Sequence, residues 1–223
     1  LVLGHEAAGI VEEIGPDVNY VKPGDHVIIC PSIWCGECET CLRGYPYLCE
    51  NRQMRTPDQP ARLSMQGKPV AQFTNVASFA ERMVITERGL LKIEDELPLE
   101  TAALIGCGIL TGLGAVLRTA KPEAGSTIAV FGAGGVGLAA VQGAYIAGAR
   151  TVISVDINEY KMATAKEFGA THAVDASQGD PVEAIREITG GVGVDYAFEA
   201  IGNTRTAEQA FACVRPIGGT AVL

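Results

Sequence analysis

The sequence lacks three features that would point to a membrane, a secretory route or a nucleic acid. It has no run of 18 apolar residues, so no membrane-spanning helix is predicted. No signal peptide is visible, although the chain begins Leu-Val-Leu-Gly without an initiator methionine and stops inside an apolar run, so we expect both ends of a longer protein to be missing. Basic residues are outnumbered by acidic ones, 17 to 26. The net charge of −9 argues against nucleic acid or an anionic membrane as a partner.

The composition that remains is typical of a soluble α/β protein. The 223 residues are 48% hydrophobic and 19% charged, which suits one large or two modest domains. Seven cysteines are an odd number, and four of them are tightly clustered. Such cysteines indicate metal ligation in a reducing compartment, the cytoplasm, and not a disulfide framework.

One stretch, residues 127–156, has the pattern of a dinucleotide-binding βαβ unit. An apolar β-forming run precedes three glycines with Gly-x-Gly-x-x-Gly spacing, Gly132, Gly134 and Gly137. These would allow a tight turn, a close approach of the backbone to a pyrophosphate, and close packing of the next helix on the sheet. A second β-branched run ends on Asp156, whose carboxylate can accept both ribose hydroxyls and thus favours NAD over NADP. The alternative is a glycine-rich turn of some other βαβ unit, with Asp156 only capping a helix.

The order of patterns predicts a β-rich first half and an alternating second half. Residues 9–14 and 25–30 are β-like runs bounded by glycine and proline, residues 79–86 are strand-like, and residues 101–118 are helical with an interruption at 106–108. Later strands are expected at 127–131, 151–155, 171–174, 194–198 and 219–223.

With helices between these strands, the second half is predicted to be a doubly wound parallel sheet, class α/β. A full sheet of this type has six strands, so the last strand would be missing and the fifth would be an unpaired edge. The expected domains are residues 1–108 and 109–223.

Four cysteines have the spacing of a zinc knuckle, Cys-x2-Cys-x2-Cys-x7-Cys. They are Cys35, Cys38, Cys41 and Cys49. Four thiolates would fill a tetrahedral zinc sphere and leave no place for water or substrate, so this zinc would be structural. An iron–sulfur cluster is the alternative, but no proline follows a fourth cysteine as in ferredoxins.

Four further residues are candidates for chemistry. His5 and Glu6 follow Gly4, and a histidine can ligate a metal, although a His beside an acid is more often a structural pair. Cys107 lies between two glycines that would let a thiolate approach a metal, although a lone cysteine is usually a small buried hydrophobe. Thr111 lies one helical turn further on.

Taken together, these residues resemble the zinc-containing medium-chain alcohol dehydrogenases. The resemblance rests on GHEAAGIVEEIGPDV, KPGDHVI, the four-cysteine lobe, IGCGILTG, and VFGAGGVG followed by VDIN. GKPVAQF and SFAERMVI also resemble the alcohol dehydrogenase and glutathione-dependent formaldehyde dehydrogenase branches. The fold it implies is a partial GroES-like β-rich catalytic domain, residues 1–108, followed by a Rossmann domain.

The resemblance implies a role for each matched position. The catalytic-zinc ligands would be His5 and Cys107, with Glu6 as the acid that can approach the metal, and Thr111 would belong to the catalytic set. The structural zinc would be held by Cys35, Cys38, Cys41 and Cys49. The NAD-binding positions would be Thr111, Gly132, Gly134, Gly135, Val136, Gly137, Asp156, Lys161, Ile201 and Gly202.

The implied activity is reversible oxidation of an alcohol to an aldehyde or ketone, with two zinc ions per full-length subunit and NAD as hydride acceptor. The third catalytic ligand and the start of the proton relay would lie upstream of Leu1, so the fragment itself is expected to be inactive. A polyol or glutathione-adduct dehydrogenase, or a silent NAD- and zinc-binding protein, is the alternative. The glutathione-dependent branch has an arginine where this chain has Gln53. A homo-oligomer is expected for the full-length protein.

Overall fold

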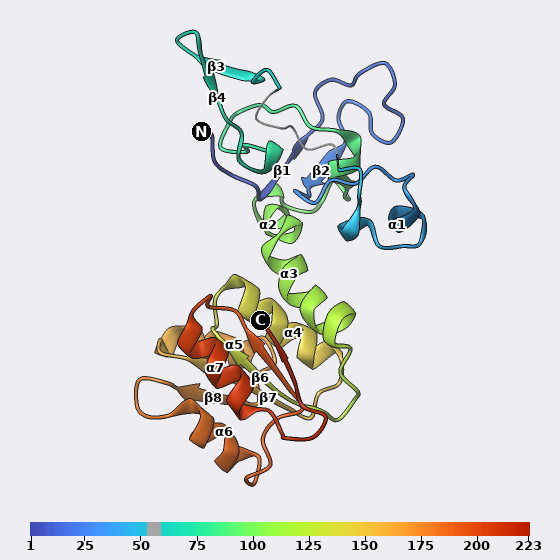
Figure 1. The fold of residues 1–223 in the computed structure, drawn as a ribbon. Helices are drawn as coiled ribbons and strands as arrows, with labels where there is room; N and C mark the ends of the chain where they lie inside the picture. The colour runs from blue at the N-terminus through green and yellow to red at the C-terminus, as the bar shows by residue number, and fades with distance from the viewer. Residues whose placement is uncertain (53–58) are drawn as a thin grey trace. The chain divides into compact units, whose positions relative to one another are not determined.

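The protein forms two compact units, Leu1–Cys107 and Gly108–Leu223, in a computed structural model that describes residues 1–52 and 59–223 (Figure 1). Gln53, the position compared above with an arginine, lies outside the described residues. Among the described residues, no single helix has the length and apolar character to cross a membrane. The consecutive segments Leu99–Gly106 and Gly108–Ala120 reach that length and composition only when taken as a pair.

The first unit contains a small antiparallel sheet in the order β1-β2-β5, formed by Ala7–Ile10, His26–Ile29 and Leu90–Lys92. A separate hairpin joins β3 (Leu63–Met65) to β4 (Lys68–Val70) through Gln66 and Gly67. Both turn residues have positive φ, which matches the twist of a two-residue hairpin. The unit also has short helical segments, which are α1 (Glu39–Leu42), η1 (Pro46–Leu48), η2 (Phe73–Asn75), η3 (Glu87–Gly89), α2 (Leu99–Ala102) and η4 (Ala103–Gly106).

The strand expected at residues 79–86 was wrong, because the structure assigns no strand there. Its side chains Phe79 and Val84 are 75% and 76% exposed, so they do not pack on a neighbouring strand. A β-like composition forms a strand only where another strand pairs with it. The strand expected at residues 9–14 begins earlier, at Ala7, and ends at Ile10.

The second unit is built on a five-stranded parallel sheet in the order β10-β9-β6-β7-β8. The strands are β6 (Thr127–Phe131), β7 (Thr151–Asp156), β8 (His172–Asp175), β9 (Tyr196–Glu199) and β10 (Thr220–Val222). The predicted doubly wound sheet is therefore confirmed, with each strand within two residues of its expected bounds. The fifth strand is not wholly unpaired, since β10 pairs with β9 on one side and forms an edge of the sheet.

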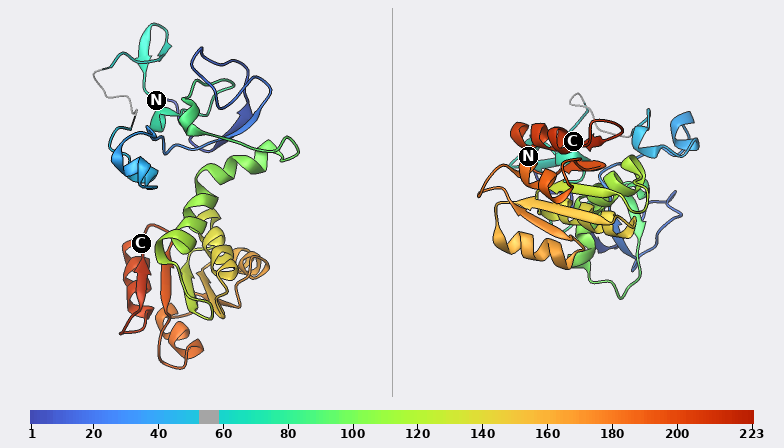
Figure 2. Two further views of the ribbon diagram at one scale, coloured as in Figure 1. Left: turned by 90° about the vertical axis from the view of Figure 1, so that its right-hand side faces the viewer. Right: turned by 90° about the horizontal axis from the view of Figure 1, so that it is seen from below.

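Helices cover both faces of this sheet (Figure 2). On one face, α4 (Gly135–Ile146) and α5 (Glu159–Glu167) pack on a core that includes Val130 and Val141. On the other, α6 (Pro181–Ile188) and α7 (Thr204–Cys213) pack on a core that includes Phe131 of β6 and Ile185 of α6 itself. Polar residues begin three of these helices, because the side chains of Asn158, Asp180 and Asn203 accept N–H groups of the first turn.

The helical stretch expected at residues 101–118 is interrupted where the sequence predicted. A Cβ atom on Gly106 would lie 2.1 Å from the carbonyl oxygen of Ile29, so only glycine fits against this end of β2. Cys107, with φ −139° and ψ −73°, leaves the helical conformation. The chain then continues as α3 (Gly108–Gly114) and a π-helical turn, η5 (Ala115–Ala120).

Candidate functional site

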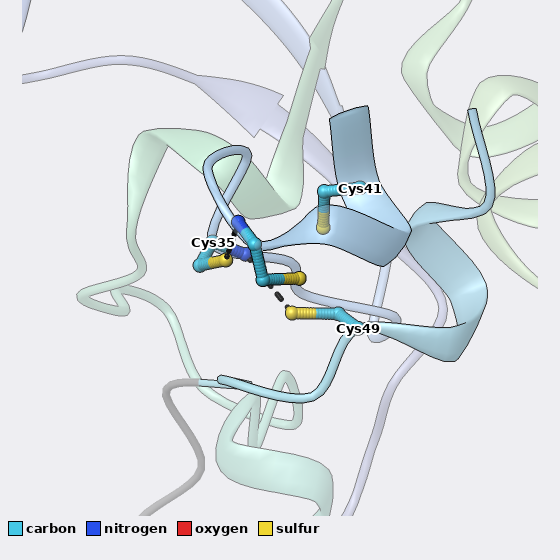
Figure 3. A group of neighbouring side chains, drawn as sticks. Cys35, Cys41 and Cys49 are labelled. Atoms are coloured by element: carbon cyan, nitrogen blue, oxygen red, sulfur yellow. Dashed lines mark hydrogen bonds between the residues drawn. The ribbon is translucent and has the colours of Figure 1, made fainter. Parts of the chain in front are cut away.

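The four clustered cysteines converge in the first unit (Figure 3). Their sulfur atoms all lie within 4.8 Å of one another. Cys35 and Cys38 belong to the turn before α1, Cys41 lies in α1, and Cys49 follows η1. Within residues 1–52 and 59–223, this is the one group of three or more His, Cys, Asp or Glu side chains gathered closely enough to hold a metal ion.

Backbone N–H groups point at these sulfur atoms. The N–H of Cys35 donates to Sγ of Cys49 at 3.3 Å, and the N–H of Cys38 donates to Sγ of Cys35 at 3.3 Å. The N–H of Glu37 is 3.5 Å from the same sulfur of Cys35. Such donors favour the thiolate over the thiol.

The pKa values of two thiols, Cys38 and Cys41, shift in opposite directions, as expected for acidic groups crowded into one site. The N–H groups of Cys41 and Glu50 lower the pKa of Cys38 to about 6. Burial raises the pKa of Cys41 to about 12, although the N–H of Gly36 acts in the opposite direction. Four close thiols cannot all ionise without a cation between them, and a divalent ion removes that conflict. The donor set, its spacing and its N–H groups therefore fit a closed tetrathiolate zinc site.

His5 and Cys107 flank the same end of strand β2. Ala7 pairs with Ile29 in the antiparallel ladder, so His5 lies just beyond that end of the sheet. Gly106 packs on the Ile29 carbonyl, which brings the adjacent Cys107 to the same place.

The backbone around His5 is tightly held. The carbonyl of Gly4 accepts the Ser78 N–H at 3.0 Å, and the imidazole of His5 makes an edge contact with the ring of Phe73, with centroids 5.5 Å apart. The side chain of Glu6 is exposed. His5, Glu6 and Cys107 do not form a three-ligand cluster among the described residues, so their shared metal stays a prediction.

The glycine loop after β6 has the shape of a phosphate cradle. Gly132 has φ +95°, and a Cβ there would meet Ile201 at 2.7 Å. A Cβ on Gly137 would lie 1.8 Å from the carbonyl oxygen of Gly132, so α4 packs against the loop at a distance that only glycine allows. Gly134 and Gly135, at the start of α4, have no atom within 4 Å of their Cβ positions, and this open space lies at the N–H end of the helix.

Asp156, at the carboxyl end of β7, closes one side of this loop. Its Oδ2 accepts the Ala133 N–H at 2.8 Å, and its Oδ1 accepts the N–H groups of Ile157 and Asn158 at 2.8 and 3.0 Å. The carboxylate thus ties the end of β7 to the glycine loop. In the following helix α5, the side chain of Lys161 is exposed.

The loop after β9 closes the other side. The chain runs from β6 to β7 and β8 on one side and then returns to place β9 beside β6, so the order of the sheet reverses between β6 and β9. Ligands of such sheets bind at this switch point. Ile201 and Gly202 lie there, held by the Glu199 carboxylate, which accepts their N–H groups at 2.8 and 3.0 Å.

Glu199 was missed by sequence reasoning. Burial would raise its pKa, but hydrogen bonds from Thr206 Oγ1 and the N–H groups of Ile201 and Gly202 outweigh burial and lower it. The available signal was an acid at the end of a strand directly before the Ala-Ile-Gly turn.

Thr111 and Val136 come close through the packing of α3 on α4. Gly112 follows Thr111, and a Cβ on Gly112 would lie 2.2 Å from the carbonyl oxygen of Val136. Thr111 is exposed on α3, next to this contact, and Val136 is in the first turn of α4. The helix contact therefore places both residues beside the glycine loop.

Two family models match the chain. One is described as "Alcohol dehydrogenase GroES-like domain" and matches residues 1–95, and the other is described as "Zinc-binding dehydrogenase" and matches residues 135–223. Among curated proteins, the chain is 44% identical over 230 residues to an alcohol dehydrogenase class-3 of Oryza sativa subsp. japonica, and 44% identical to one of Zea mays. All of this chain is covered in each case, and it spans about 60% of the length of these relatives.

Among solved structures, alcohol dehydrogenases are again similar to this chain. An "Alcohol dehydrogenase zinc-binding domain protein" of Burkholderia ambifaria is 42% identical with a TM-score of 0.86, over 95% of this chain and 59% of that one. The benzyl alcohol dehydrogenase of Acinetobacter calcoaceticus is 36% identical with a TM-score of 0.86, over 99% of this chain and 61% of that one.

Proposed function

The chain belongs to the zinc-containing medium-chain alcohol dehydrogenases, and from that premise we propose that the whole protein transfers a hydride between an alcohol and NAD. The product would be an aldehyde or a ketone. The observation that carries the proposal is the glycine loop at the switch point of the sheet. The loop is open at Gly134 and Gly135 and is bounded by Asp156 on one side.

The residues of the second unit would hold and orient NAD. The N–H end of α4 and the open backbone at Gly134 and Gly135 suit the pyrophosphate. Asp156 would exchange part of its backbone hydrogen bonding for the ribose hydroxyls, with Lys161 nearby, and its negative charge disfavours the 2′-phosphate of NADP. Thr111, Val136, Ile201 and Gly202 would line the nicotinamide end.

The residues of the first unit would hold two zinc ions in the whole protein. Cys35, Cys38, Cys41 and Cys49 would bind a structural zinc, since four sulfur ligands leave no open position. His5 and Cys107 would bind the second with a ligand from outside this chain, and Glu6 is the acid beside it. When both groups are bound, zinc supplies a Lewis acid for the alcohol oxygen and NAD supplies the hydride acceptor.

The test is NAD reduction by the full-length protein with a panel of primary, secondary and aromatic alcohols. Benzyl alcohol belongs in the panel because one structural neighbour is named a benzyl alcohol dehydrogenase. We expect turnover with NAD, no turnover in a His5→Ala variant, and NAD binding in both proteins. Tight NAD binding without reduction by any alcohol would refute the activity and favour a silent NAD- and zinc-binding protein.

The full-length protein is also proposed to be a cytoplasmic homo-oligomer. The argument for the compartment is the set of seven free thiols, four of them gathered as metal ligands, which requires reducing conditions. Size-exclusion chromatography with light scattering tests the oligomer, and a monomer at micromolar concentration would contradict it.

A further inference from the structure

The short turn η3, Glu87–Gly89, lies against the loop that carries the first two metal cysteines. Gly36 stands between Cys35 and Cys38 with φ +81°, and a Cβ built on it would lie 2.5 Å from Nη1 and 3.0 Å from Cζ of Arg88. The guanidinium of Arg88 therefore occupies the space that any side chain at position 36 would need.

Glu87 and Gly89, on either side of Arg88, are each fixed to a different segment. The Glu87 carboxylate accepts the N–H groups of Asn19 and Tyr20, both at 3.1 Å. The carbonyl of Gly89 accepts the N–H of Cys30 at 2.9 Å. With the turn held on both sides, the stem of Arg88 starts from a fixed position.

Arg88 differs from three other arginines of the chain in its ionic contacts. The arginines at 43, 82 and 215 form ion pairs with Glu39, Glu12 and Asp195. In the part of the chain that the structure describes, no ion pair involves Arg88. The charge of Arg88 also acts on its neighbour Glu87, whose carboxyl pKa is lowered chiefly by the N–H groups of Tyr20 and Asn19, while the guanidinium packs against Gly36 of the cysteine turn.

The cysteine site would need such a charge once it is loaded. Four thiolates and one Zn²⁺ carry two negative charges in excess, and nearby donors and cations stabilise such a centre. The N–H groups at this turn act directly on the sulfur atoms, because those of Glu37 and Cys38 approach Cys35 and that of Gly36 interacts with Cys41. The guanidinium packed on Gly36 adds positive charge next to this turn and restrains the turn that aims those donors.

We propose that Arg88 is a positioning residue of the cysteine metal site, which offsets the excess charge of the zinc-loaded thiolates through its contact with Gly36 and so slows the release of metal. The proposal rests on the zinc assigned to these cysteines under the proposed function. The proposal gives the metal site a fifth residue besides its four ligands, Arg88, which lies on a turn 39 residues beyond Cys49.

The experiment measures zinc release from the full-length protein to a colorimetric chelator in excess. A His5→Ala background limits the signal to the cysteine zinc. Arg88→Met removes the charge and keeps the length of the side chain, and Arg88→Lys keeps the charge. Arg43→Met is the matched control, because it removes a charge from the same lobe, but one that is already paired with Glu39 at 3.5 Å.

We expect Arg88→Met to release zinc about 10-fold faster, Arg88→Lys to stay within about threefold of the parent, and Arg43→Met to be unchanged. The excess rate of Arg88→Met should shrink in about 1 M salt, where the Debye length falls to about 3 Å. Iodoacetamide should also alkylate the cysteines of zinc-loaded Arg88→Met faster than those of the parent.

Three results would overturn the role of Arg88. These are equal release rates for parent and Arg88→Met, equal acceleration by Arg43→Met, or an effect of Arg88→Met that high salt does not reduce. If the full-length His5→Ala protein that keeps Arg88 contains no zinc, the zinc assignment of the four cysteines is refuted, which is a different failure from that of the role of Arg88.

Discussion

Replacement of Gly137 by alanine gives the sharpest test of how the glycine loop is built. The new Cβ would lie 1.8 Å from the carbonyl oxygen of Gly132 and 2.8 Å from its carbonyl carbon. Real Cβ contacts are essentially never below 3.0 Å, so α4 and the loop would have to separate by about 1.2 Å. Both sides of the clash are backbone, which cannot rotate away.

The expected cost follows from that displacement. Overpacking a dense interior costs about 1–3 kcal/mol, and a clash between two fixed backbones belongs at the upper end, so we expect about 3 kcal/mol. For a chain of this size that corresponds to a melting temperature lower by about 6–12 °C. Thermal unfolding followed by circular dichroism measures the shift.

Gly134→Ala is the matched control, because it tests binding without the clash. No atom lies within 4 Å of its Cβ position, and its φ of −81° suits any residue. The melting temperature should stay within about 2 °C, while calorimetric titration should show NAD binding weakened at least about 10-fold, because the Cβ would enter the pyrophosphate space. An unchanged melting temperature for Gly137→Ala, or unchanged NAD affinity for Gly134→Ala, would refute this account of the loop.

Three further predictions concern the other charged and metal-binding groups. Asp156→Ser should lower the ratio of kcat/KM with NAD to kcat/KM with NADP at least about 10-fold, and an unchanged ratio would mean that the ribose site is misplaced. The same change should lower the melting temperature, because the Ala133 N–H loses its acceptor. Cys38→Ala should lose one zinc per subunit by elemental analysis and melt earlier, yet bind NAD with a Kd within about twofold, since the NAD loop lies in the other unit; full zinc retention would contradict the assigned ligands. Lys92, at 2.7 Å, and Lys22 hold the pKa of Asp25 well below its usual range, so this carboxylate stabilises the fold above about pH 4 and the contribution is lost as the pH falls further. Urea unfolding between pH 3 and 7 should show a shallower acid loss in Asp25→Asn, and parallel curves would exclude this group as a cause.

The second unit could be predicted closely because its patterns are local. Strand β6, Thr127–Phe131, has the expected bounds, and its five residues are all buried, as a continuous apolar run in a parallel sheet implies. The glycine spacing also predicted the turn and the start of α4, because that pattern is local in the sequence. Sequence reasoning missed Glu199, because its role depends on hydrogen bonds within a loop, and loops have no periodic residue pattern.

The first unit was harder to predict because its secondary structure depends on contacts between segments that are far apart in the sequence. Residues 79–86 have strand-like character, but nothing in the local sequence says whether a second strand lies beside them. The contact of Gly36 with Arg88 joins positions 52 residues apart, and spacing alone gave no sign of it. The cysteine cluster is the exception, since three of its four members lie within seven residues.

Diffraction data collected at the zinc absorption edge from crystals of the full-length protein with NAD test the central claim most directly. The account predicts two anomalous peaks per subunit, one among the sulfur atoms of Cys35, Cys38, Cys41 and Cys49 and one between His5 and Cys107. A single peak at the four cysteines, with the imidazole of His5 turned away from Cys107, would contradict it.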